Sequence, residues 1–221
     1  YGHDLIRDRE IIALIASALA YGKVAQILKS ISTVLEILGD EPYQFLMNTT
    51  HGSLKKKFGG FVHRFARGSH LAALLWGARK TIIEFGSLNG CVSSAISPGD
   101  RDLIPAMTFF SEQLCSAGKG PGHLVAMPRK GSACKRMNLY LRWMVRKDRV
   151  DPGGWKGVRR SHLVIPLDTH MHKIGLNFGF TKRKQADMRT ALEITSGFKK
   201  LSPRDPVKYD FTLTRFGIRD D

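Results

Sequence analysis

Apolar residues recur at helical spacing along most of the chain. Residues 8–19, 24–38, 71–82 and 102–117 each place apolar side chains three or four positions apart. This spacing gathers the apolar side chains on one face of a helix, and Gly39 and Gly86 end the second and third segments. We therefore expect four helices, and for the second a core-facing set of Val24, Ile27, Leu28, Ile31, Val34, Leu35 and Leu38.

The segment between the second and third helices lacks such a pattern. Residues 40–60 hold Pro42 and a run of three lysines, and we expect them to form a loop. Residues 58–65 mix aromatic and basic residues, which would suit a base-stacking surface, although composition favours burial of Phe61 and Phe65. No convincing strand pattern occurs in residues 1–145. The sequence therefore predicts a mainly α fold.

A tight turn leads into another amphipathic helix in the second half of the chain. Pro128 and Gly131 are turn residues, and Ser132 is a preferred N-cap residue. The predicted helix has an apolar face with Leu139, Trp143 and Val145 and a basic face with Lys135, Arg136, Arg142 and Arg146.

Residues 147–161 form a predicted loop, because Pro152, Gly153 and Gly154 disfavour a long helix. Trp155 on this loop has two interpretations, since a loop tryptophan can stack on a base or pack the loop onto the core. Two further helices are predicted, one that ends near Lys200 and one over residues 205–217.

An apolar run ends at an acidic residue. Residues 163–167 read Leu-Val-Ile-Pro-Leu and lead to Asp168 at the start of a predicted helix. The apolar run cannot solvate a carboxylate, whereas a helix N-terminus offers free backbone N–H groups and the positive end of the dipole. Asp168 is therefore expected to be ionised and fixed, either as an ordinary helix cap or as a catalytic acid.

Lys135 lies in the first turn of the helix predicted after Gly131. The helix dipole disfavours a cation at this end and favours the neutral amine. A lysine that can lose its proton is a nucleophile. Because a turn followed by a helix N-terminus can also hold a backbone phosphate, the segment offers a nucleophile beside a phosphate site.

These two segments resemble known DNA repair enzymes. Gly131-Ser-Ala-Cys-Lys135, followed by Pro166-Leu-Asp168-Thr-His-Met-His-Lys173, looks like the helix-hairpin-helix DNA glycosylase superfamily. Its hairpin carries a catalytic Lys, and its next motif reads Val-Asp-Thr-His-Val. The resemblance implies that Lys135 is the nucleophile that excises the base and that Asp168 stabilises the sugar cation and assists the lysine.

The resemblance also implies an architecture. It predicts a single helix-hairpin-helix glycosylase domain over residues 1–221, built of two helical lobes with the active site in the cleft between them. The hairpin would occupy residues 124–146, and the catalytic Asp segment residues 161–180.

Two features distinguish the chain from the endonuclease III branch of that superfamily. Ala133 stands where the family hairpin usually has the second Gly of Gly-x-Gly. The connection from Lys135 to Asp168 is longer and is more similar to that of the archaeal 8-oxoguanine glycosylases. Residues 8–218 also resemble a bacterial group of hypothetical proteins assigned to the same superfamily.

Polar residues around the two motifs are candidates for DNA contact. They lie in the hairpin, after Asp168 and in a basic run further on: Lys130, Gly131, Ser132, Ala133, Arg136, His170, Lys173, Lys182, Arg183 and Lys184. In the family, the junction after the first helix lies at the DNA and often carries a Gln that probes the vacated base stack. Here it holds Leu19, Ala20 and Tyr21. Candidates for the base pocket or wedge are Tyr21, Lys23 and Trp155.

Positive charge concentrates in the half that holds both motifs. The formal net charge is +16, and residues 119–221 carry 23 Lys and Arg against 9 Asp and Glu, whereas residues 1–118 carry 12 against 10. Clustered cations favour a polyanion partner. We therefore expect a monomer that binds double-stranded DNA containing a damaged base, rather than a membrane, which would favour a basic amphipathic helix at one end.

Cysteine and histidine positions limit the cofactors. Three cysteines, far apart and odd in number, favour a reducing compartment: Cys91, Cys115 and Cys134. They cannot supply the ligands of a four-cysteine iron–sulfur cluster, and His162, His170 and His172 match no zinc spacing without further ligands. We expect no metal and no cofactor, no membrane span, and a cytoplasmic, nucleoid-associated protein.

Two classes of function remain open from the sequence. The first is a base-excision-repair DNA glycosylase with AP lyase activity, with 8-oxoguanine as the leading substrate, or a monofunctional glycosylase for another lesion. The second is a noncatalytic helix-hairpin-helix module that uses the hairpin only to hold phosphates. A binding module has no use for Lys135 together with Asp168, so the sequence favours the enzyme.

Overall fold

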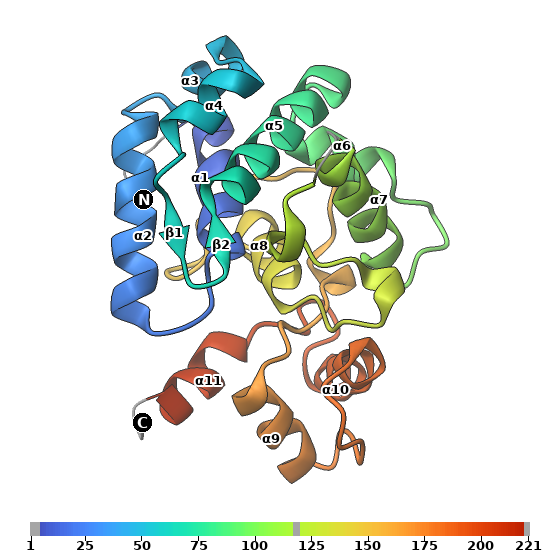
Figure 1. Ribbon diagram of the computed structural model, residues 1–221. Helices are drawn as coiled ribbons and strands as arrows, with labels where there is room; N and C mark the ends of the chain where they lie inside the picture. Colours follow the sequence, from blue (N-terminus) through green and yellow to red (C-terminus); the bar gives the residue numbers. More distant parts are fainter. Residues whose placement is uncertain (1–4, 117–119, 219–221) are drawn as a thin grey trace. The chain divides into compact units, whose positions relative to one another are not determined.

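A computed structural model describes residues 5–116 and 120–218 (Figure 1). In this part of the chain it has eleven α-helices, three short 3-10 helices and one pair of two-residue strands. The predicted mainly α fold is confirmed. The chain divides into two compact units, residues 1–95 with 109–126 and residues 96–108 with 127–221.

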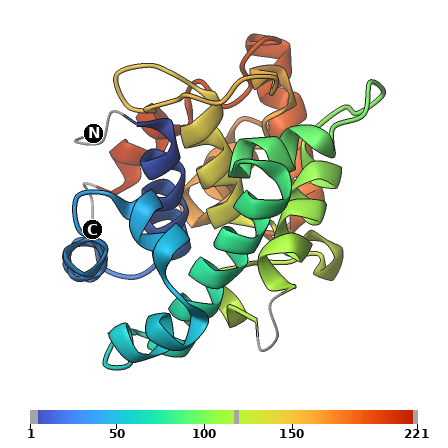
Figure 2. The same cartoon turned by 90° about the horizontal axis from the view of Figure 1, so that it is seen from above.

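The first unit is built around two buried helices. α1 (Ile6–Ala18) and α5 (Gly68–Phe85) form at predicted positions, and Figure 2 shows α5 from above. α5 packs against α4 and α6, and α1 against α2 and α3. The remaining elements of the unit are α2 (Val24–Leu38), α3 (Pro42–Asn48), α4 (His51–Lys57), β1 (Val62–His63), β2 (Ala66–Arg67), α6 (Leu88–Ser94) and η1 (Gly122–Leu124). α7 (Ile104–Cys115) begins in the second unit and ends in the first.

The predicted loop at residues 40–60 is wrong, because this segment forms α3 and α4. Pro42 stands in the first turn of α3, where a proline loses no hydrogen bond. Thr50 caps α4 by accepting a hydrogen bond from the backbone N–H of Ser53 at 3.2 Å. Each helix has only 7 residues, which is too short for a clear apolar repeat.

The burial expected for α2 is also wrong in part. Val34 and Leu38 are buried, but Val24 is 61% exposed and Leu28 is 60% exposed. The helix packs against its neighbours through its C-terminal half and leaves the start of its apolar face open. A helical repeat identifies the apolar face of a helix, but it does not show how much of that face packs against other elements.

Two buried acids of α1 hold the starts of other helices. Asp8, 4% exposed, accepts a hydrogen bond at 2.7 Å from the backbone N–H of Tyr43 in α3. Glu10, 2% exposed, accepts hydrogen bonds from the backbone N–H groups of Leu88 and Asn89 in α6, the latter at 2.8 Å. The two buried carboxylates thus accept hydrogen bonds from backbone N–H groups that have no partner within their own helices.

The second unit contains both sequence motifs. Its elements after the start of α7 are η2 (Pro128–Lys130), α8 (Lys135–Val145), η3 (Arg160–His162), α9 (Thr169–Asn177), α10 (Met188–Leu201) and α11 (Asp210–Ile218). α9 packs against both α10 and α11 (Figure 1). The apolar run at residues 163–167 is extended and buried, and the backbone N–H of Ile165 donates to Thr195 Oγ1 at 3.0 Å.

α8 is buried on nearly all sides, which the sequence did not predict. Its N-cap is Cys134 rather than Ser132. Arg142 and Arg146, expected on a solvated face, are 2% and 5% exposed, whereas Trp143, expected in the core, is half-buried. The arginines are buried because carboxylates from other segments of the unit neutralise them.

Trp155 packs into this unit. It is 6% exposed, and its ring meets that of Tyr140 edge-on with centroids 5.4 Å apart. Its backbone N–H donates to the carbonyl of Met144 at 3.0 Å. Of the two interpretations of Trp155, the structure supports packing of the loop onto the core, because a buried ring has no free face for a base.

Candidate active site

The structure joins the two candidate catalytic residues directly. Lys135 Nζ lies 3.1 Å from Asp168 Oδ2 in the second unit. The side chain of Lys135 is 40% exposed and that of Asp168 is 20% exposed. A ligand can therefore reach both groups.

Asp168 is fixed by the start of α9. It is the N-cap residue, and its Oδ1 accepts a hydrogen bond from the backbone N–H of Met171 at 2.8 Å. The buried extended run of residues 163–167 delivers it there. One carboxylate oxygen thus caps the helix, and the other is left to bind the ammonium group of Lys135.

Lys135 is the first residue of α8, as the sequence predicted for the first turn. The preceding residue, Cys134, is 1% exposed and has a left-handed backbone with φ of 47°. Burial raises the pKa of the Cys134 thiol, so the thiol stays protonated beside the lysine. The accessible nucleophile at this turn is therefore the amine of Lys135.

The turn before Lys135 is tied to the start of α10. Gly131 has φ of 76°, a conformation that glycine adopts without strain, and its carbonyl accepts from the backbone N–H of Met188 at 3.2 Å. Ser132 forms an antiparallel bridge with Asp187, and its Oγ accepts from the backbone N–H of Cys134 at 3.2 Å. Ala133 is buried, with its carbonyl bound by the side chain of Asn138. These contacts fix the position of the turn in front of α8.

The predicted DNA contacts differ in exposure. Lys130, Lys173, Lys182 and Lys184 are exposed, and Arg136, His170 and Arg183 are half-buried. Tyr21 and Lys23, the wedge candidates, belong to the first unit. Lys23 is exposed, whereas Tyr21 is half-buried with its hydroxyl bound to the carbonyl of His63 and to His123 Nε2.

Arg183 is held inside the second unit. Its Nε donates to Thr190 Oγ1 at 3.0 Å, and its guanidinium pairs with Asp187. Asp187 is the N-cap of α10, and the hydrogen bond from the backbone N–H of Thr190 holds the pKa of its carboxyl below the usual value. Arg183 therefore supports the start of α10, whereas Lys182 and Lys184 remain open to solvent.

A buried ionic cluster lies along the α8 face that carries Lys135. Arg142 follows Lys135 by seven residues, two helical turns along the same face. It binds both carboxylate oxygens of Asp151, at 3.0 and 3.1 Å, and also pairs with Asp210 at the start of α11. Arg146, one turn further, pairs with Asp151 and with Asp205. The cluster anchors α11 and the loop at residues 147–161 to α8.

Asp210 connects this cluster electrostatically with the site. Burial raises the pKa of Asp210 to about 6, Arg142 opposes this rise, and the charge of Asp168 adds to it. Its Oδ1 is buried and has no hydrogen-bond partner among the described residues. Sequence reasoning missed Asp210, because its partner Arg142 is 68 residues away in the sequence and no local pattern links the two.

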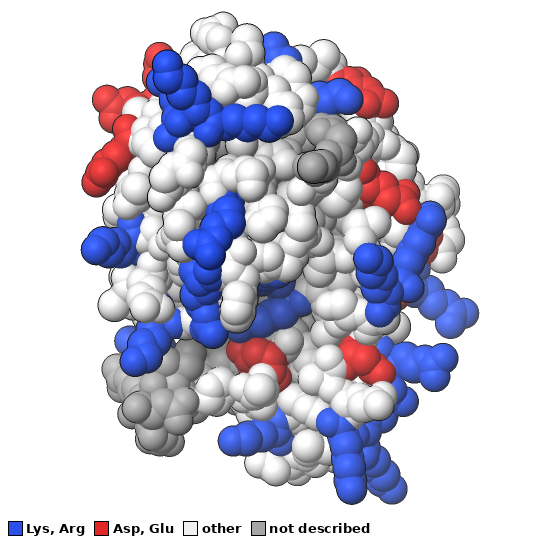
Figure 3. Space-filling view, in the orientation of Figure 1, with Lys and Arg blue, Asp and Glu red and all other residues white. Residues whose placement is uncertain are grey.

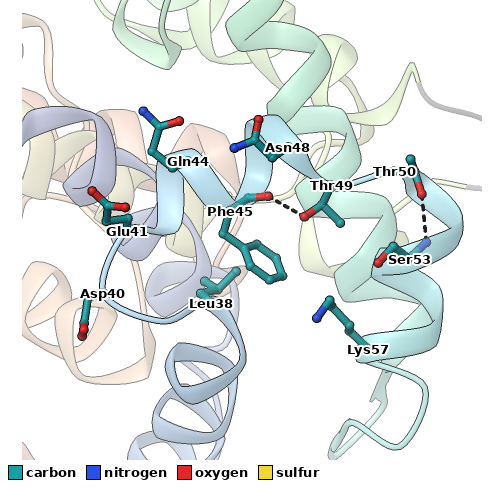
Figure 4. Close-up of a pocket in the computed structure, with 10 residues that line it drawn as sticks. All are labelled: Leu38, Asp40, Glu41, Gln44, Phe45, Asn48, Thr49, Thr50, Ser53 and Lys57. Carbon is teal, nitrogen blue, oxygen red and sulfur yellow. Dashed lines mark hydrogen bonds between the residues drawn. The ribbon is translucent and has the colours of Figure 1, made fainter.

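The surface hollow in Figure 4 is a poor candidate for the chemistry. It has a volume of about 760 Å³ and lies in the first unit between the end of α2, α3 and α4. Lys57 Nζ lies 5.5 Å from the centre of the Phe45 ring there. The ten lining residues include no cysteine or histidine, and their one lysine faces that ring (Figure 4).

The described residues show no group of three or more His, Cys, Asp or Glu arranged to hold a metal ion. In the same part of the chain, no helix combines the length and apolar character that a membrane crossing requires.

The comparisons with known proteins identify a family. The chain belongs to the family described as "Protein of unknown function (DUF2400)", whose match covers residues 3–219. No curated protein and no solved structure matches the chain.

Proposed function

We propose that this member of the DUF2400 family is a DNA glycosylase with AP lyase activity. The observation that carries the proposal is the 3.1 Å contact of Lys135 Nζ with Asp168 Oδ2, with both side chains open to a ligand. The pair combines a nucleophile with a positioned acid, the unit that this chemistry needs.

The reaction follows from the two groups. After the ammonium group of Lys135 loses a proton to solvent, its neutral amine attacks C1′ of the sugar. The C1′–N bond breaks as the base leaves with its electron pair, and the base takes up the proton that the attacking nitrogen releases. The carboxylate of Asp168 stabilises the positive charge that develops on the sugar. The nitrogen bonded to C1′ then forms an imine as the C1′–O4′ bond breaks and O4′ takes up a proton from solvent, which opens the sugar ring. Loss of a proton from C2′ breaks the C3′–O3′ bond and expels the 3′ phosphate.

The fixed position of Asp168 supports this assignment. Its Oδ1 is engaged with the backbone of α9, so the carboxylate cannot rotate freely away from Lys135. A charge placed before the reaction stabilises the transition state without a reorganisation cost. The helix cap uses only Oδ1 of Asp168, and the contact of Oδ2 with the partly exposed Lys135 contributes little to stability by itself.

Positive charge supports duplex DNA as the partner. Figure 3 shows Lys and Arg side chains around α9 and α10. Phosphate neutralisation by such residues provides most nonspecific affinity for DNA. The leading substrate is 8-oxoguanine, on the resemblance to the archaeal glycosylases, and the two-lobed helix-hairpin-helix glycosylase fold with its site between the lobes belongs to the same proposal.

The test is a panel of duplexes that each carry one damaged base. The wild-type protein should release at least one base, nick the strand, and form a covalent adduct when borohydride reduces the imine. Lys135→Gln should lose both the adduct and the nick while duplex binding stays nearly unchanged. Lys130→Gln is the matched control, since it removes an exposed lysine from the same turn, and it should still form the adduct.

The outcomes separate the alternatives. If Lys135→Gln still releases a base without nicking, the enzyme is monofunctional, with water as nucleophile and Asp168 as its activator. If the wild type neither releases a base nor forms an adduct on any duplex of the panel, the noncatalytic DNA-binding module replaces the enzyme.

A further inference from the structure

The β1–β2 hairpin of the first unit exposes an aromatic ring at its tip. Val62 pairs with Arg67 and His63 with Ala66, so Arg64 and Phe65 form the two-residue loop. Phe65 is 71% exposed, and the burial expected for it from composition is wrong. One exposed apolar side chain needs no special explanation, but the surroundings of this ring point to a use for it.

Hydrogen bonds anchor the base of the hairpin. His63 is 3% exposed, and its Nδ1 lies 2.9 Å from Ser30 Oγ of α2. Its Nε2 lies 3.1 Å from the carbonyl of Tyr21, and the hydroxyl of Tyr21 donates back to the carbonyl of His63 at 3.0 Å. The tip is therefore held in place before any ligand arrives, which lowers the entropy cost of binding through Phe65.

Arg64 places a cation beside the exposed ring. Its guanidinium carbon lies 5.6 Å from the centre of the Phe65 ring. Its backbone has φ of 51°, which is uncommon for a residue with a side chain and persists where the surroundings fix it. Its side chain lies against Gly22, where an added Cβ would stand 2.9 Å from Arg64 Cδ. The turn after α1 thus leaves room for this arginine.

The surface around Phe65 is basic. Lys23, Arg64 and Arg67 are exposed. A neighbouring hollow of about 450 Å³ has two cations and no carboxylate in its lining: Gln26, Lys29, Ser30, Thr33, Gly60, Phe61, Val62, His63 and Arg64. An exposed ring flanked by cations is the arrangement that binds unpaired strands, because the ring stacks on a base and the cations hold phosphates.

We infer that the Arg64–Phe65 tip is the stacking element of a binding surface for single-stranded DNA. Phe65 stacks on an unpaired base, and Lys23, Arg64 and Arg67 hold the adjoining phosphates. Every base offers a flat face, so the surface is tolerant of sequence. The inference needs neither a lesion nor Lys135, and it stands apart from the proposed glycosylase activity.

The test is the affinity of the full chain for a short fluorescein-labelled thymidine oligonucleotide and for a blunt undamaged duplex. Phe65→Ala should weaken binding of the oligonucleotide on the order of tenfold, the scale of one base stack, and leave duplex binding nearly unchanged. Phe65→Leu, apolar but without a ring face, should lose most of the same affinity. Phe65→Trp should retain it.

Val62→Ala is the matched control, since Val62 is 54% exposed on the same hairpin and has no ring. It should bind both ligands as the wild type does. Equal affinity of the wild type, Phe65→Ala and Phe65→Leu for the oligonucleotide would overturn the inference, as would an equal loss for oligonucleotide and duplex in Phe65→Ala. Oligonucleotide binding and formation of the borohydride adduct on the lesion panel are measured independently, so failure of either proposal is seen separately.

Discussion

Asp168 divides its two carboxylate oxygens between α9 and Lys135. Oδ1 accepts the backbone N–H of Met171 at 2.8 Å, and Oδ2 lies 3.1 Å from Lys135 Nζ. The structural role and the proposed chemical role therefore reside on different atoms of one side chain. This division allows a substitution that removes the charge and keeps the cap.

Asp168→Asn should lower base release by about 100- to 1,000-fold, the scale on which an electrostatic stabiliser acts. The amide oxygen can still cap α9, because Asn is as good an N-cap residue as Asp, so the melting temperature should change little. Single-turnover release of the base and a thermal melt measure the two effects.

Asp187→Asn is the control for that substitution. Asp187 caps α10 by accepting from the backbone N–H of Thr190 at 2.9 Å and pairs with a cation, as Asp168 does. Its variant should release the base at the wild-type rate. An equal loss in both variants would mean that the effect comes from disturbed helix starts and not from the charge of Asp168.

Lys182→Gln and Lys184→Gln should weaken binding of all duplexes alike, damaged or not, because exposed lysines bind the DNA backbone rather than the bases. Removing one lysine–phosphate interaction should reduce the slope of log affinity against log salt concentration by about 0.9. Fluorescence anisotropy at several salt concentrations measures this. Loss of affinity for only one damaged duplex would place these lysines in the base pocket.

Arg183→Gln should behave differently from its two neighbours. Its side chain holds Thr190 and Asp187 at the start of α10, so the variant should melt at a lower temperature than Lys182→Gln or Lys184→Gln. A melting temperature equal to theirs would show that the side chain of Arg183 does not support α10.

The free energy of unfolding should depend on pH through the titration of Asp210. Burial raises the pKa of this carboxyl from 3.8 to about 6 in the folded protein. Between these two pH values the folded state keeps a proton that the unfolded state has lost. The free energy of unfolding therefore falls as pH rises through this window, and the Asp210 contribution is level above it.

Asp210→Asn should remove that pH dependence. The wild type minus the variant in free energy of unfolding should therefore change between about pH 4 and 6. Urea titrations at several pH values measure it. Asp168→Asn should lower the midpoint of the change, because the charge of Asp168 contributes to the raised pKa of Asp210. A difference that stays constant from pH 4 to 6 would contradict the raised value.

The sequence predicted helices best where the apolar repeat is long and the helix packs against other elements along its whole length. α1, α5 and α7 formed at or near the expected positions. The 7-residue α6 and the two-residue strands escaped prediction because they contain too few positions for a period to show. The exposed start of α2 shows that periodicity alone does not reveal how far a partner extends.

Local sequence also predicted the placement of Lys135 and Asp168 at helix starts, since each depends on a turn, a cap and a dipole within a few residues. The buried cluster beneath them could not be predicted in the same way. Arg142 and Arg146 read as a solvated face, because the carboxylates of Asp205 and Asp210 come from a segment more than fifty residues away. Pairing of this kind depends on tertiary structure.

The carboxylate of Glu10 makes the start of a distant helix dependent on α1. It accepts hydrogen bonds from the start of α6 across 78 and 79 residues of sequence, so these two N–H groups have this acceptor only while α1 is packed in the unit. Shortening the chain through α1 therefore removes these carboxylate acceptors from the starts of α3 and α6, in addition to removing a packed helix. α1 therefore contributes to the stability of the unit in two ways, through its apolar packing and through the carboxylates that bind the starts of two other helices.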